Sequence, residues 1–172
     1  MSWFDKRTKA EKFEDQWTAT RVHESGHVLA AYLNGERVVE VAARVRSGWF
    51  SDPEPEHSAV ITSSGPGIDP WAKLVGFMSG GAAESVLYEA WGWNRGRIKR
   101  EVNTHMHGDL EGIGTYFDFI GERLTDRMIR HAQAEAYGLM ATYWEHVWRL
   151  AHALDVEDGR LTGDQAYAVL SG

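Results

Sequence analysis

The sequence predicts a mainly α-helical protein with a small β element, an α+β helical bundle that carries one short strand pair. Three observations predict this class. Apolar residues recur at helical spacing in several long segments, β-branched residues gather in two short ones, and turn residues separate the segments. The 172 residues are 43% hydrophobic and 25% charged, which is typical of a globular protein. We therefore expect a single domain over residues 18–172, with residues 1–17 as an extension or the start of the first helix.

The first predicted helix is the most clearly marked one. Apolar residues approximate helical spacing from Trp17 to Leu33, and the following Asn34 and Gly35 are suited to end a helix. Thr8 and Glu11 have the spacing of a capping box, so the helix can begin in the charged segment 6–12. Gly26 stands mid-helix, where glycine costs roughly 1 kcal/mol relative to alanine. We expect it, with Ser25, to let another element approach closely.

Two segments are β-rich. Residues 37–46 contain four valines, and residues 57–63 contain valine, isoleucine and threonine, so we expect both to form strands that pair with each other. Residues 48–56 lie between them and include two prolines, which favours a loop. Residues 65–67, Gly-Pro-Gly, predict a break after the second strand.

Four further helices and one loop complete the expected fold. Asp69 followed by Pro70 is typical of a helix start, and this helix should run to about Ala90. Residues 91–99 contain glycine and several basic side chains and are expected to form a loop. A helix should then cover residues 109–120, one long helix residues 125–154, and a short helix capped by Thr162 the segment up to Leu170.

Composition excludes several classes of protein. A formal net charge of −7 argues against a general nucleic-acid binder. No apolar run approaches the roughly 18 residues of a membrane span, and the N-terminus lacks a signal-peptide core, so a cytoplasmic protein with no membrane partner is expected. The chain has no cysteine, so histidines and carboxylates must supply any metal site.

Residues 23–27, His-Glu-Ser-Gly-His, match the H-E-x-x-H pattern of zinc metallohydrolases. On a helix, His23 and His27 share one face, where both imidazoles can bind one Zn²⁺. Glu24 flanks that ion and can act as general base towards an activated water molecule. The alternative is a chance match on a surface helix, which the helical context disfavours. The pattern predicts a metallohydrolase and within that class favours a protease.

Two histidines require a third ligand. Glu84 is one candidate, because the small residues around it would let its helix pack tightly beside the first one. Asp109 is the other leading candidate, at the expected start of a helix, where aspartate is also a common N-cap. His105 and His107 could themselves reach a metal. Residue chemistry alone leaves this choice open.

Several segments occur in the order found in one known family. Residues 23–27 are similar to its HEAGH, residues 80–84 (Gly-Gly-Ala-Ala-Glu) resemble its GGRAAEE, and residues 108–110 (Gly-Asp-Leu) resemble a turn that ends in Asp-Leu. Residues 38–46 are similar to its edge strand, and residues 161–165 to the entry of its closing helix. From about residue 18 to 170, the chain thus resembles the peptidase domain of FtsH-type AAA+ zinc metalloproteases.

This resemblance implies roles for individual residues. It makes His23, His27 and Asp109 the zinc ligands and Glu24 the base, and it leaves Glu84 to orient a ligand histidine or to pack beside it. The implied substrate is an unfolded or flexible polypeptide that adds to the strand near the site. The implied substrate-binding residues are Val38, Val39, Glu40, Val41, Ala42, Ala43, Arg44 and Val45.

The chain also departs from the family. It has no G-x-x-x-x-G-K-[ST] phosphate loop and no membrane anchor, so we expect hydrolysis without an ATPase of its own. His105 and His107 replace small or hydroxylated residues, which leaves a histidine ligand or a second metal open. The leading hypothesis is an ATP-independent zinc endopeptidase. The alternatives are a catalytically silent metal- and peptide-binding regulatory protein, or a protease subunit that depends on a separate ATPase partner; a homo-oligomer also stays open.

Overall fold

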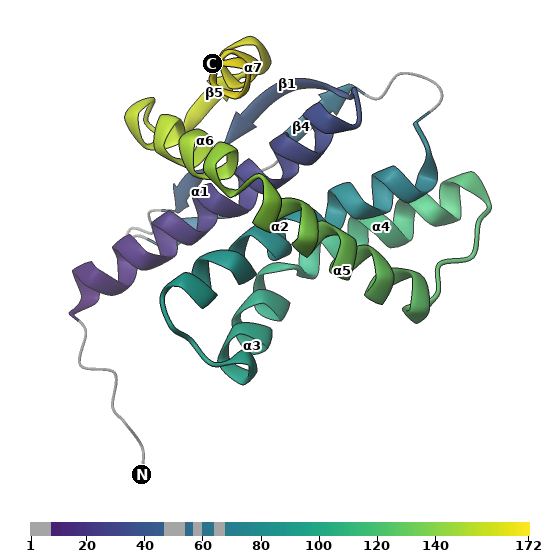
Figure 1. Ribbon diagram of the computed structural model, residues 1–172, viewed down its shortest axis with the longest axis horizontal. Helices are drawn as coiled ribbons and strands as arrows, with labels where there is room; N and C mark the ends of the chain where they lie inside the picture. Colours follow the sequence, from purple (N-terminus) through teal and green to yellow (C-terminus); the bar gives the residue numbers. More distant parts are fainter. Residues whose placement is uncertain (1–7, 47–53, 57–59, 64–67) are drawn as a thin grey trace.

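The computed structural model describes residues 8–46, 54–56, 60–63 and 68–172 (Figure 1). These ranges are mainly helical, with two small antiparallel sheets, which confirms the predicted class. The elements in order are α1 (Lys9–Leu33), β1 (Arg37–Ala42), β2 (Arg44–Arg46), β3 (Glu54–Glu56), β4 (Val60–Ser63), α2 (Pro70–Ala90), α3 (Arg95–His105), α4 (His107–Ile120), α5 (Asp126–Thr142), α6 (Trp144–Val156), β5 (Arg160–Thr162) and α7 (Gly163–Ser171). No helix of the described ranges is both long enough and apolar enough to cross a membrane.

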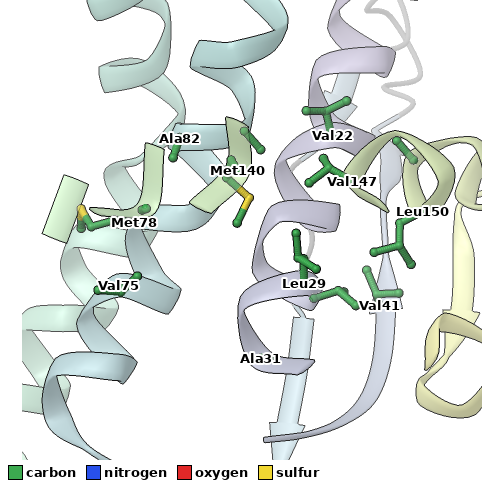
Figure 2. Packing of buried hydrophobic residues seen from close by; sticks show 14 of the residues in the cluster. Val22, Leu29, Ala31, Val41, Val75, Met78, Ala82, Met140, Val147 and Leu150 are labelled. Carbon is green, nitrogen blue, oxygen red and sulfur yellow. The ribbon is translucent and has the colours of Figure 1, made fainter. Parts of the chain in front are cut away.

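Helix α1 runs through the middle of the protein. On one side it packs against α2, which in turn packs against α5, and on the other side against α6 and β1 (Figure 2). Val22 and Leu29 are buried in this core, as are Met78 of α2 and Leu150 of α6. Because neighbours cover α1 on opposite sides, nearly every residue from Ala19 to Ala31 is buried. Residues 23–27 therefore lie within the buried stretch of α1.

The start and end of several elements follow the sequence signals. Thr8 and Glu11 form the predicted capping box of α1, and Asn34 ends that helix. The Asp69 side chain accepts a hydrogen bond from the backbone amide of Trp71 at the start of α2, which ends at Ala90 as predicted. Thr162 caps α7. Residues 8–17, predicted as an extension or as the start of the first helix, belong to α1 and its cap.

Helices α1 and α2 approach one another closely at Gly26. A Cβ added to Gly26 would lie 2.5 Å from the backbone oxygen of Ser79 and 2.9 Å from the Ala83 Cβ. A side chain at this position would therefore collide with the α2 backbone. This finding confirms that Gly26 lets another helix come close to the histidines.

The three-stranded sheet has the order β4-β1-β5. Strand β1 pairs antiparallel with β4, with Val38 opposite Thr62, which confirms the predicted pairing for the described part of residues 57–63; residues 57–59 lie outside it. On its other side β1 pairs with β5, with Val41 opposite Leu161. The prediction that residues 38–46 form an edge strand is wrong for β1. Strand β5, from the far end of the chain, pairs with its second side.

The predicted strand over residues 37–46 is also interrupted. It divides at Ala43, whose backbone amide donates to the Gly159 carbonyl, and β2 then pairs with β3 instead of extending the first sheet. Residues 54–56, predicted as loop, are therefore a strand. The rest of that loop, residues 48–53, and the break at residues 65–67 lie outside the described residues.

One loop prediction and one helix prediction are wrong. Residues 95–99 of the expected loop 91–99 all belong to α3, which the Asn94 side chain caps and which packs against α2 through Ile98 and Val102. Its basic and glycine-containing start hid the helix. The single helix expected over residues 125–154 is two helices that meet at Tyr143. The chain turns there because α5 packs against α2 while α6 packs against α1.

Candidate metal centre

Three potential metal-binding side chains converge between α1 and α4. The Nε2 atoms of His23 and His27 are 3.0 Å apart, as their positions one helical turn apart allow. Oδ2 of Asp109 is 3.2 Å from His23 Nε2, and Oδ1 of Asp109 is 3.3 Å from His27 Nε2. Asp109 lies in the first turn of α4 and not at its N-cap, which is Met106. The structure thus brings together the three residues that the resemblance implied as ligands.

These side chains fit a divalent metal ion. Donors bound at about 2.0–2.1 Å in a tetrahedral arrangement lie roughly 3.3 Å apart, close to the separations found here. A Cβ added to Gly80 would lie 2.5 Å from both Nε2 atoms, so the missing side chain keeps room in front of the two imidazoles. Imidazole and carboxylate donors suit zinc and several other divalent metals.

Hydrogen bonds fix the orientation of both rings. Nδ1 of His23 lies 2.6 Å from Glu84 Oε1, and Nδ1 of His27 lies 2.9 Å from the backbone oxygen of Gly76. A carboxylate and a carbonyl oxygen only accept, so each Nδ1 carries the hydrogen. Nε2 of the neutral ring is then the atom that can bind a metal, and it faces Asp109 in both cases.

The other candidate ligands lie away from the two Nε2 atoms. Glu84 is fully buried on the Nδ1 side of His23. Its second oxygen, Oε2, accepts hydrogen bonds from His105 Nδ1 at 2.6 Å and from the Tyr88 hydroxyl at 3.0 Å. The His107 side chain is 80% exposed and lies 3.3 Å from Glu111. The structure therefore favours Asp109 over Glu84, His105 and His107 as the third ligand.

The carboxylates of this cluster are strongly acidic. Burial is the largest influence on Glu84 and raises its pKa, but hydrogen bonds from His105 and His23 outweigh it and hold the pKa at about 2. Burial also raises the pKa of Asp109, yet the charge of His27 and hydrogen bonds from both histidines bring the net value well below its usual range. Both groups are therefore ionised at neutral pH.

The pKa values of the two histidines shift in the opposite direction. Burial lowers the pKa of His23, but hydrogen bonds to Asp109 and Glu84 overcome it and raise the net pKa well above 6.5. For His27, burial lowers the pKa and the charge of Asp109 raises it, again with a net increase. In the metal-free site the two imidazoles therefore keep their second proton up to a higher pH than free histidine does, and a metal ion must displace it.

Glu24 lies beside these rings. Its side chain is 1% exposed, and its negative charge raises the pKa of both His23 and His27. A buried carboxylate at this place can exchange a proton with a molecule held against the histidines.

The predicted substrate residues, 38–45, do not form one accessible strand. Val38, Val41, Ala42 and Ala43 are buried, whereas Val39 is 48% exposed. Both sides of β1 are paired at Glu40 and Val41, so an added strand has no place there. Among the described strands of this sheet, β4 and β5 form the two edges.

No family model matches this chain, and no curated protein is detectably similar to it in sequence. The assignment of the site therefore depends on its geometry. The contacts of Glu84 with His105 and Tyr88 escaped the sequence analysis. One signal was available for Tyr88, which stands four residues after Glu84 and so shares its helix face. None was available for His105, which reaches Glu84 from another helix.

Proposed function

We propose that this protein is a zinc-dependent endopeptidase whose fold resembles the FtsH-type peptidase domain and which cleaves flexible or unfolded polypeptides. One observation carries the proposal. The Nε2 atoms of His23 and His27 converge with the Asp109 carboxylate at separations that suit one metal ion, beside the buried Glu24. This combination supplies both a metal site and a general base.

Each of these residues has a chemical task. His23, His27 and Asp109 would hold zinc, which when bound polarises a substrate carbonyl and lowers the pKa of a water molecule to about 7. Glu24 would take a proton from the attacking water molecule and give a proton to the leaving nitrogen as the C–N bond breaks. Glu84 and the Gly76 carbonyl keep the two rings oriented throughout.

An extended substrate suits the sheet beside α1. A peptide that adds to a sheet edge binds through main-chain hydrogen bonds, which demand little of its sequence. Because β1 is flanked on both sides, β4 replaces it in this proposal as the strand to which the peptide adds. Such a mode favours unfolded segments, since a folded protein cannot present an extended backbone.

Proteolysis of casein tests this function. Zinc-loaded protein should degrade casein, an unfolded protein, without ATP, and a chelator should abolish the activity. Glu24→Gln should bind zinc as the wild type does and lose activity, because an amide cannot accept the proton at neutral pH. Full activity of this variant would contradict the assigned mechanism.

The test also separates the competing functions. Tight peptide binding without cleavage by the zinc-loaded wild type would favour a catalytically silent regulatory protein. Activity that appears only with a copurifying ATPase would favour a partner-dependent subunit. The intact Glu24 favours the endopeptidase, since a silent binding protein has no use for a base.

A further inference from the structure

His105 belongs to the hydrogen-bond network around the buried Glu84, and the proposed reaction gives it no role. It is the last residue of α3, its side chain is 21% exposed, and its Nδ1 lies 2.6 Å from Oε2 of the fully buried Glu84. We propose that His105 is a positioning residue of the metal centre, which holds Glu84 in place and through it fixes the ring of His23. This inference rests on the proposed metal site.

The two oxygens of Glu84 have separate partners. Oε1 faces His23 Nδ1, while Oε2 accepts from His105 and Tyr88. A carboxylate with one anchored oxygen can rotate about its terminal bond. The contacts to Oε2 prevent that rotation and keep Oε1 aimed at His23. Loss of the His105 donor would leave a buried acceptor with the longer Tyr88 contact alone, which is unfavourable.

The same short stretch of chain reaches both nitrogens of His23. Asp109 contacts Nε2 directly, whereas His105 acts on Nδ1 through Glu84. Met106 lies between these two residues in sequence, links α3 to α4 and is buried. Residues 105–109 therefore act on the His23 ring from two sides, at Nε2 directly and at Nδ1 through Glu84.

Tyr88 provides a second, weaker anchor. Its ring stacks on Trp93 with centroids 4.3 Å apart and an angle of 4° between the planes. The Arg97 guanidinium carbon lies 3.4 Å from the Trp93 ring centroid on this same cluster. The stack holds the Tyr88 hydroxyl towards Glu84 at 3.0 Å, a longer contact than that of His105. Removal of this hydroxyl should therefore matter less than removal of the imidazole.

Zinc affinity measured against a chromophoric chelator tests the inference. His105→Leu removes the donor at similar bulk, and His105→Asn places an amide N–H close to where Nδ1 stands. We expect the leucine variant to bind zinc about 10-fold more weakly, at the low end of the roughly 10–100-fold loss typical for a direct hydrogen-bond partner of a ligand, because His105 acts through Glu84. The asparagine variant should recover most of the affinity, and Tyr88→Phe should lose less than His105→Leu.

Two further readouts separate positioning from a general structural effect. Urea unfolding of each metal-free variant reports whether the fold is retained. The visible spectrum of the Co²⁺-loaded protein should change in His105→Leu and be restored in His105→Asn, because it reports the geometry of the ligands. If the leucine variant does not fold, His105→Ala removes the same donor without added apolar bulk.

The outcomes distinguish this inference from the proposed function. Wild-type zinc affinity in a folded variant without the donor would overturn the inference alone, as would equal losses in the leucine and asparagine variants. If the wild type itself binds no zinc, the proposed function fails and the inference fails with it.

Discussion

Gly80 of α2 lies directly against His23 of α1, so that a Cβ on Gly80 would stand 2.5 Å from the imidazole Nε2. The same Cβ would be 2.5 Å from Nε2 of His27. These are the two atoms that can bind a metal, and Asp109 faces both of them. Gly80 therefore keeps one side of the candidate metal centre open.

Gly80→Ala should weaken zinc binding at this site. Its methyl group would occupy space against both imidazoles and push them apart, with an overpacking cost of roughly 1–3 kcal/mol. Equilibrium zinc binding and urea unfolding should be measured together. Gly138→Ala is the matched control, because the same change in α5 meets nothing within 4 Å. Unchanged zinc affinity in Gly80→Ala would show that its methyl group leaves the metal-binding atoms undisturbed.

Asp109→Ala should cause the largest loss of zinc among substitutions outside α1. It removes a donor that faces both Nε2 atoms, so the loss should exceed the roughly 10–100-fold effect of removing a residue that only supports a ligand. His107→Ala is the control, because that side chain is 80% exposed and pairs with Glu111. Zinc stoichiometry of the two purified variants tests this prediction. Equal stoichiometry would show that Asp109 is not a ligand.

Zinc affinity should fall as the pH is lowered. The pKa values of His23 and His27 are raised by Asp109 and its neighbours, so protons occupy the imidazoles at pH values where free histidine is neutral. Zinc must displace them, and binding therefore releases protons. Calorimetry in buffers of different ionisation enthalpy measures this release directly. A pH-independent affinity with no proton release would contradict the protonated metal-free site.

The stability of the metal-free protein should decline on both sides of an optimum. The pKa of Glu84 falls from 4.5 to about 2 on folding, so its contribution is complete above pH 4.5 and is lost as the pH drops towards 2. The raised pKa values of His23 and His27 contribute stability below pH 6.5 that is lost as the pH rises through the folded-state values.

Urea unfolding across pH, with and without zinc, measures these two trends. Zinc should reverse the decline at higher pH, because it binds the neutral imidazoles of the folded state. Glu84→Gln should reduce the decline at low pH, since an amide does not titrate. An acid-side profile identical to that of the wild type would contradict the assigned role of the Glu84 charge.

The sequence alone determined those features of this protein that depend on residues close together in the chain. His23 and His27 share a face because the helical repeat places residues four apart on one side, and no tertiary contact is needed for that. The capping box of α1 and the Asp69 start of α2 are equally local, since side chains bond to the backbone two or three residues away.

Tertiary structure decided how distant segments meet. The choice of Asp109 over Glu84 and His107 depends on where α4 packs, and the link between Glu84 and His105 depends on how α3 lies against α2. Strand β1 became central only because β5 joins it from the end of the chain. Such contacts arise from packing between residues far apart in sequence, which helical repeat and turn chemistry do not encode.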